Sequence, residues 1–97
     1  METFVILGKY TEKGAANMKE SPARIQAARK AVEAAGGKWI GWYLTMGQYD
    51  FVLITQAPNA QAAAAVLLAT GMQGNASTQT MRAFTEEEFK GLVASLP

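Results

Sequence analysis

The sequence predicts a small α+β domain in which two strand–helix–strand units share one antiparallel sheet. Segments rich in β-branched and aromatic residues have the length of strands, and they alternate with segments of helical periodicity. Glycine and proline separate these segments in the order strand, helix, strand, strand, helix, strand, and one more amphipathic helix follows. At 97 residues, the chain has the length of one domain, so we expect residues 1–97 to fold as a single unit.

The first predicted strand, residues 3–10, is apolar on both of its alternating faces. Phe4 and Ile6 fall on one face, and Val5 and Leu7 fall on the other. A strand that is apolar on both faces is typical of the middle of a sheet.

The next segment carries the first helix. Residues 11–20 are polar and predict a loop, and Ser21-Pro22 then favours a helix start with the serine as the cap. Gly36-Gly37 predicts the end of this helix. The apolar stripe of the helix consists of Ile25, Ala28, Val32 and Ala35.

Residues 38–46 and 49–56 predict a hairpin around Gly47-Gln48, because glycine in the first position suits a two-residue type II′ turn. This turn would place Met46 opposite Tyr49 and Thr45 opposite Asp50. Strict alternation then predicts that Trp39 and Trp42 lie on opposite faces of the sheet. The predicted companions of Trp42 are Ile40, Leu44, Met46, Tyr49, Phe51 and Leu53, and those of Trp39 are Tyr43, Val52 and Ile54.

The second half of the chain again predicts a helix followed by a strand, and one further helix follows. Asn59 is the expected cap of an alanine-rich helix that ends at Thr70-Gly71. The polar strand at residues 76–84 suits a sheet edge. Residues 85–88 form a capping box that places three carboxylates at the positive end of the last helix. The apolar stripe of that helix consists of Phe89, Leu92, Val93 and Leu96.

This βαββαβ order predicts a ferredoxin-like, four-stranded antiparallel sheet in the order 4-1-3-2, with both main helices on one face and a C-terminal helix added. Two helices cover only one face, yet three strands are apolar on both. An exposed apolar face of this size favours association. We therefore expect a homodimer or higher homo-oligomer, packed sheet against sheet or edge to edge. The alternative is that the C-terminal helix or residues 11–20 fold over the second face.

Composition excludes several classes of function. Lysine and arginine total 9 against 8 acidic residues, and no basic face is visible, so we expect no nucleic-acid partner. The longest apolar run, residues 62–69, is too short to span a bilayer, so we expect no membrane partner. The first residues do not resemble a secretion signal, so we expect a cytoplasmic protein.

The chain contains neither histidine nor cysteine. It therefore cannot supply a histidine-ligated haem or zinc site, a thiolate, or the base of a serine or cysteine triad. No glycine-rich phosphate-binding motif is present. We expect neither a metal nor another cofactor.

Several separated motifs resemble the GYD domain family along most of the chain. The hairpin sequence TMGQYD at residues 45–50 is followed by an apolar strand and by Ala57-Pro58-Asn59. Further matching segments are residues 8–11, 19–24, 36–38, 74–75 and 82–89. The resemblance implies a fold of the dimeric α+β barrel group, in agreement with the self-association expected above, and it implies no particular reaction.

Asp50 and Tyr49 are the candidate catalytic residues. The expected sheet order brings Lys9 and Tyr10 close to Asp50, and a half-buried carboxylate beside a tyrosine hydroxyl can act as a general base. In the alternative interpretation, Asp50 is structural. It then accepts hydrogen bonds from Thr45, Lys9 or a backbone N–H and fixes the hairpin or a subunit contact.

The aromatic side chains around the hairpin could line an apolar ligand pocket. The candidate ligand-binding residues are Lys9, Tyr10, Trp42, Tyr43 and Arg82. Arg82 would steer a weakly anionic ligand. The alternatives are that the aromatic residues form core and subunit interface, and that Arg82 is solvated or paired with an acidic neighbour.

Three functions remain open. The first is a small-molecule-binding or regulatory homo-oligomer that takes an apolar or weakly anionic ligand. The second is a cofactor-independent enzyme of the isomerase or oxygenase type that uses Asp50 and a tyrosine, and the third is a structural assembly subunit. A closed cavity reached by Asp50 favours the enzyme, a cavity without convergent polar groups favours binding, and the absence of a cavity favours assembly.

Overall fold

The structure is a computed structural model that describes residues 1–97. Along the chain its elements are β1 (Glu2–Tyr10), α1 (Glu12–Ala16), the 3₁₀ turn η1 (Met18–Glu20), α2 (Ser21–Ala34), β2 (Lys38–Leu44), β3 (Phe51–Ala57), α3 (Ala60–Gly71), β4 (Ala76–Ala83) and α4 (Glu86–Ala94). No helix is both long enough and apolar enough to cross a bilayer.

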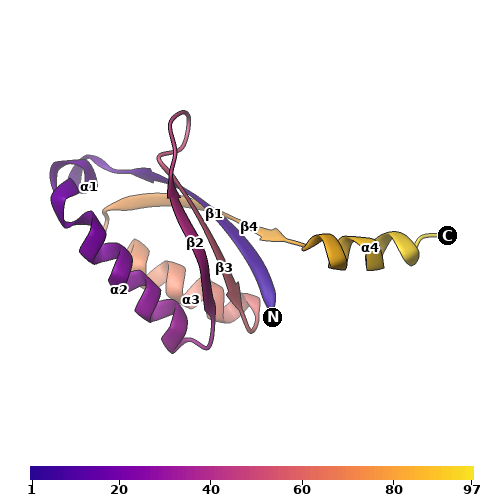
Figure 1. The fold of residues 1–97 in the computed structure, drawn as a ribbon. Helices are drawn as coiled ribbons and strands as arrows, with labels where there is room; N and C mark the ends of the chain where they lie inside the picture. The colour runs from indigo at the N-terminus through magenta and orange to yellow at the C-terminus, as the bar shows by residue number, and fades with distance from the viewer.

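The four strands form one antiparallel sheet in the order β2-β3-β1-β4. This is the predicted ferredoxin-like order, with the doubly apolar β1 inside the sheet and the polar β4 at an edge. Helices α2 and α3 lie on the same side of the sheet (Figure 1). The small core forms between them and the sheet, around Phe4, Ile6 and Ala57. The predicted fold class is therefore confirmed.

The loop predicted for residues 11–20 is wrong, because the segment is helical in α1 and η1. The Thr11 hydroxyl accepts a hydrogen bond from the Gly14 N–H (3.2 Å) and caps α1. Gly14 is buried against the backbone of Asn75, where a Cβ would lie 2.0 Å from the Asn75 carbonyl oxygen. The cap and this close approach explain why a polar, glycine-containing segment forms a helix.

The serine cap predicted for α2 is also wrong. The helix begins at Ser21, and its cap residue, Glu20, makes no side-chain capping bond. Ser21 is instead buried, and its hydroxyl lies 2.7 Å from the hydroxyl of Tyr10. The Ser21 hydroxyl thus bonds to a distant side chain instead of capping its own helix. At the other end, Gly36 ends the helix with a φ of 81°, as predicted.

The hairpin between β2 and β3 is longer than predicted. The last paired residues are Leu44 and Phe51, so the connection is a six-residue loop, Thr45–Asp50, and Met46 does not pair with Tyr49. Within the loop, the Thr45 hydroxyl donates to the Tyr49 carbonyl (2.6 Å), which takes that carbonyl out of the ladder. Thr45 and Asp50 do face each other, and the Thr45 N–H donates to the Asp50 carbonyl (2.8 Å).

A β-bulge in β2 corrects the prediction for the tryptophans. The register shifts between Trp39 and Gly41, so the exposed Ile40 has no partner in β3. The extra residue breaks the two-residue alternation. Trp39 pairs with Thr55 and Trp42 pairs with Leu53, and both indoles therefore lie on the face that the helices cover.

The opposite side of the sheet, which we call the outer face, has no covering element in the chain. Its apolar side chains are Val5, Leu7, Tyr43, Val52, Ile54 and Met81. Helix α4 points away from the body of the domain, and α1 sits beyond one end of the sheet (Figure 1). The alternative in which the C-terminal helix or residues 11–20 fold over this face is therefore wrong.

Both predicted caps in the second half are present. The Asn59 side chain accepts from the Ala62 N–H (2.9 Å) at the start of α3. At the start of α4, Thr85 and Glu88 form the predicted capping box. The apolar stripe of α4 is exposed to solvent.

The capping box predicts how α4 responds to acid. The backbone N–H of Thr85 donates to the Glu88 carboxylate (2.9 Å) and, together with the Thr85 hydroxyl and Arg82, holds the pKa of Glu88 below its ordinary value of 4.5. A lowered folded pKa stabilises the helix start above about pH 4.5 and loses that effect as the pH falls through the folded value.

We therefore expect the Thr85 amide resonance in an NMR titration to move with a midpoint below 4.5, and to lose this transition in the Glu88→Gln variant. A midpoint at or above 4.5 would contradict the assignment.

Candidate functional site

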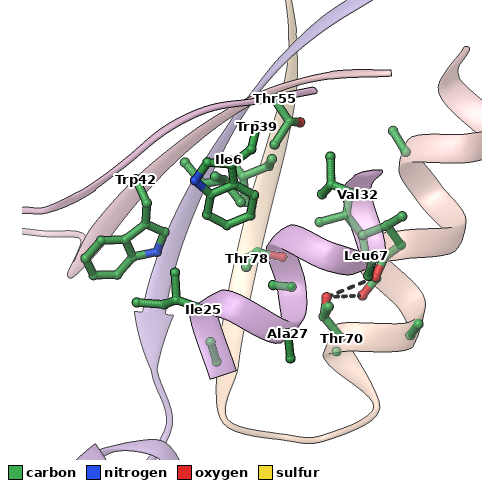
Figure 2. Close-up of a pocket in the computed structure, with 18 of the residues that line it drawn as sticks. Ile6, Ile25, Ala27, Val32, Trp39, Trp42, Thr55, Leu67, Thr70 and Thr78 are labelled. Carbon is green, nitrogen blue, oxygen red and sulfur yellow. Dashed lines mark hydrogen bonds between the residues drawn. The ribbon is translucent and has the colours of Figure 1, made fainter. Parts of the chain in front are cut away.

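A cavity of about 250 Å³ lies between the sheet and helices α2 and α3, and it is partly open to solvent (Figure 2). Its walls are mainly aliphatic, and they include Ile6, Ile25, Val32, Leu53, Val66 and Leu67. The helices face the space largely with alanines, such as Ala28, Ala31 and Ala63, whose short side chains leave part of the space between helices and sheet unfilled. The cavity thus follows from the alanine-rich composition of the two helices.

Two indole rings enter the cavity from the bulged strand β2. Trp39 and Trp42 are half-buried lining residues, and they are the only tryptophans of the chain. Trp42 stacks on Phe51, with ring centroids 5.4 Å apart and an interplanar angle of 23°. In the view of Figure 2, the nitrogen of each indole lies on the side of its ring that faces the other tryptophan, and neither joins a hydrogen bond drawn there. An indole N–H is a donor only, so both can serve an acceptor in the cavity.

Thr55 adds a polar group deep in the same wall. The residue is only 6% exposed, lies on β3 beside Trp39, and lines the cavity. Every fully enclosed side-chain polar atom has a hydrogen-bond partner. The Thr55 hydroxyl can both donate and accept, so this residue adds one polar group to the apolar wall.

The end of the cavity near the start of α2 is more polar. Here the Tyr10 and Ser21 hydroxyls bond to each other at 2.7 Å. Arg24 is the one charged residue in the lining, and its guanidinium donates to the backbone carbonyls of Asn17 (3.0 Å) and Gly14 (3.5 Å). No carboxylate lines the cavity. Glu20, outside the lining, pairs with Arg24 (3.8 Å), so the cavity offers a cation no carboxylate and offers an anion one guanidinium that is already partly balanced.

The predicted ligand-binding residues fall on both sides of the sheet. Tyr10 and Trp42 line the cavity. Lys9 and Tyr43 lie on the outer face, and the Lys9 ammonium sits 5.4 Å from the ring centroid of Tyr49. The Tyr49 hydroxyl donates to the side chain of Gln79 (2.8 Å), on the same face. These outer residues do not share a site with Tyr10 and Trp42.

Asp50 lies at the base of the hairpin and does not line the cavity. Its carboxylate accepts a hydrogen bond from the Tyr10 N–H (2.8 Å), and its own N–H donates to the Gly8 carbonyl (2.8 Å). Asp50 and Tyr10 therefore lie close together, as expected. These bonds tie the hairpin to the end of β1.

Arg82 lies away from the cavity, at the end of β4. Its guanidinium pairs with Glu2 (3.2 Å) and Glu88 (3.7 Å), and it stacks over the ring of Phe84 at 4.5 Å from the centroid. Two carboxylates already balance this cation. Its surroundings match the alternative in which it is paired with acidic neighbours.

Sequence reasoning did not single out Thr55, Ser21 or Arg24 as cavity residues. A threonine in an apolar strand and a serine before a proline have no pattern that marks a ligand site. The alternation of the sequence predicts the wrong face for Trp39, because a bulge leaves no clear mark in a sequence. The run of alanines in both helices was the one available signal for an underfilled core.

The fold is that of a small ferredoxin-like α+β domain, with a cavity between its sheet and helices. Comparison with known proteins shows the family to which this domain belongs. The model of the GYD domain matches residues 4–93, so the chain belongs to the GYD domain family. A relative in Thermus thermophilus is 31% identical over 84 residues, 86% of this chain and 88% of that protein. It is named glutamine synthetase and cystathionine β-lyase binding protein.

Solved structures from Mycobacterium tuberculosis and Thermus thermophilus share this fold. The feast or famine regulatory protein of Mycobacterium tuberculosis, complexed with L-methionine, has a TM-score of 0.66 at 14% identity over 88% of this chain. The leucine response regulatory protein of that organism has a TM-score of 0.64 at 14% identity over 87%. This chain spans about half the length of each, 51%. A crystal structure from Thermus thermophilus has a TM-score of 0.55 at 20% identity, covering 88% of this chain and 95% of that one.

Proposed function

We propose that the protein is a homo-oligomeric regulatory protein that binds a small molecule in the cavity between the sheet and helices α2 and α3. The observation that carries this proposal is the cavity itself, about 250 Å³ of largely apolar space beside two half-buried tryptophans. Its size is close to the lower end of small-molecule sites.

The lining also suggests the chemistry of the ligand. The indole N–H groups of Trp39 and Trp42 are donors only, and the hydroxyl of Thr55 can donate as well as accept. Arg24 is the only charged residue of the lining; it is positive, and it pairs with Glu20 outside the lining (3.8 Å). An apolar molecule that carries a carbonyl or carboxylate acceptor would match these groups, whereas a cation would find no counter-charge.

Binding is favoured over catalysis by the groups that the cavity lacks. Asp50 lies outside the lining, and no other carboxylate enters it. The only lining tyrosine, Tyr10, is paired with Ser21. The enzyme alternative needs a proton acceptor in contact with the ligand, and none of the lining side chains is a good one at neutral pH.

A regulatory role is supported by the family relative. That protein is named for binding two enzymes, glutamine synthetase and cystathionine β-lyase. By analogy, we propose that the ligand-bound form of this chain contacts another protein. The outer face and α4, which carry exposed apolar side chains, are the surfaces available for self-association and for such a contact.

The proposal is tested by tryptophan fluorescence, because both tryptophans of the chain line the cavity. The probe is 8-anilinonaphthalene-1-sulfonate, which is apolar and carries one anionic group. We expect saturable quenching of the tryptophan emission, with a rise in the probe emission and a dissociation constant in the micromolar range, about −8 kcal/mol or weaker. Titration with a cationic dye of similar size serves as the control. Quenching that does not saturate, or that is equal for both dyes, would count against the proposed site.

A further inference from the structure

Helix α4 carries an apolar stripe that has no partner in its own chain. Its side chains are exposed, with Phe89 at 59%, Leu92 at 50% and Val93 at 48%, and Leu96, just past the end of the helix at Ala94, continues the stripe at 68%. The helix points away from the body of the domain and makes no extensive contact with another element (Figure 1). A nine-residue helix is not stable in water on its own, so α4 requires a surface to pack against.

The direction of α4 is fixed by Arg82. This side chain bonds to Glu2 on β1 and to Glu88 on α4, so it joins the sheet to the first turn of the helix. Its stacking over Phe84 holds the two-residue connection between β4 and α4. The capping box at Thr85 and Glu88 completes the joint. The helix is thus held out from the domain by a defined set of contacts, and we call it the arm.

The exposed area of the chain is larger than a compact monomer needs. The accessible surface is 6511 Å², whereas a compact chain of 10.4 kDa exposes about 5,400 Å². The radius of gyration is 14.7 Å against about 12.5 Å for a compact domain of this length. The surplus is about 1,100 Å², and one partner in a standard-size interface buries about 800 Å². The chain therefore carries enough surplus surface for a stable dimer.

The outer face of the sheet provides a matching surface. The register places Val5 between Ile54 and Met81, and Leu7 next to Val52, so apolar side chains adjoin across strands. The same register places Lys9 and Lys38 on this face and no carboxylate. The arm begins with three carboxylates, of which Glu88 pairs with Arg82 and Glu86 with Lys90. Glu87 remains available to a cation on another copy.

The dimensions of the two surfaces also agree. Nine helical residues extend about 14 Å along the helix axis. Four strands separated by about 4.8 Å give the sheet a width of about 14 Å. An arm laid across the strands would therefore cover the whole width of the outer face.

We propose that the arm of one copy lies across the outer face of a second copy, with its stripe of Phe89, Leu92, Val93 and Leu96 on the apolar side chains of that face. The exchange is reciprocal, so each copy gives one arm and receives one. This inference rests on the proposed homo-oligomer and names the segments that form it. It leaves the cavity, on the other side of the sheet, free for a ligand.

Disulfide trapping tests the inference in the full-length chain, which has no native cysteine. A Leu92→Cys chain is mixed with a Met81→Cys chain carrying a mass tag, and the mixture is oxidised. The control pairs Leu92→Cys with Gln26→Cys, an exposed position on α2 that is outside the cavity. We expect the Leu92/Met81 heterodisulfide to form at least about tenfold faster than the control, because docking raises the effective concentration of the two thiols.

A second pair of variants checks the same contact without oxidation. Leu92→Glu places a charge in the apolar stripe and is expected to raise the dissociation constant of the oligomer by about tenfold or more, roughly 1.4 kcal/mol. Lys90→Glu introduces the same side chain away from the stripe and is expected to change this constant little. Sedimentation measures both.

The outcomes separate this inference from the proposed function. Equal rates for the two disulfide pairs, with Leu92→Glu as strongly associated as the wild type, would overturn the exchange of arms while leaving self-association intact. A wild-type chain that is monomeric in sedimentation would overturn both. Binding of the anionic dye is measured independently, and its loss would count against the cavity proposal alone.

Discussion

The Ala63→Phe variant is expected to lose most of its binding of 8-anilinonaphthalene-1-sulfonate. Ala63 packs against the core and lines the cavity, so a phenyl ring at this position enters the space that the probe would occupy. We expect the dissociation constant to rise about 30-fold, which corresponds to about 2 kcal/mol. The thermal midpoint should stay the same or rise, because the ring fills a cavity and buries apolar surface.

The matched control is Ala64→Phe, one residue further along α3. Ala64 is exposed and lies outside the lining, so the same ring should leave the affinity for the probe within about twofold, since surface substitutions have small effects. Fluorescence titration gives the dissociation constant of the dye for each variant, and thermal unfolding gives the thermal midpoint of each. If both variants bind the dye as the wild type does, the dye sits elsewhere and the cavity is an underfilled core.

Asp50→Ala is expected to destabilise the fold rather than to alter binding. The Asp50 carboxylate accepts the N–H of Tyr10 at 2.8 Å, and its removal leaves a half-buried backbone donor without a partner. The expected loss in the free energy of unfolding is about 2 kcal/mol, as for hydrogen bonds to charged groups. Because Asp50 does not line the cavity, the affinity for the dye should be unchanged under conditions where the variant is folded.

The Asp50→Asn variant separates the structural role from a chemical one. Asparagine keeps an oxygen acceptor for the Tyr10 N–H, so it should retain more than half of the stability that alanine loses. Urea unfolding of the two variants measures the difference. A variant pair with wild-type stability and markedly altered dye binding would instead support a functional role for the carboxylate.

Much of the fold could be predicted because its signals are local and consistent with one another. The doubly apolar strand around Phe4 and Val5, the glycine pair at Gly36, and the caps at Asn59 and Thr85 all predict elements that are present. Two of the errors have a common cause, which is a tertiary partner that replaces a local one. Ser21 binds Tyr10 instead of capping its helix, and Gly14 is buried against the backbone of Asn75.

The candidate site was harder to predict from the sequence than the fold. A site on this sheet depends on which face each side chain occupies, and one extra residue at Ile40 moves Trp39 to the other face. The residue types of Tyr49 and Asp50 predict a chemical role for the hairpin, yet the structure engages both residues in contacts within the sheet and loop. The cavity itself follows from small side chains, which carry no chemical signature of their own.

Native mass spectrometry of the full-length protein purified from cells tests the central claim most directly, because one spectrum reports both the number of chains and any bound small mass. We expect a dimer or higher oligomer that retains a small molecule, and we expect this added mass to be absent from the Ala63→Phe variant and present in Ala64→Phe. A monomeric chain with no added mass in any preparation would contradict the account.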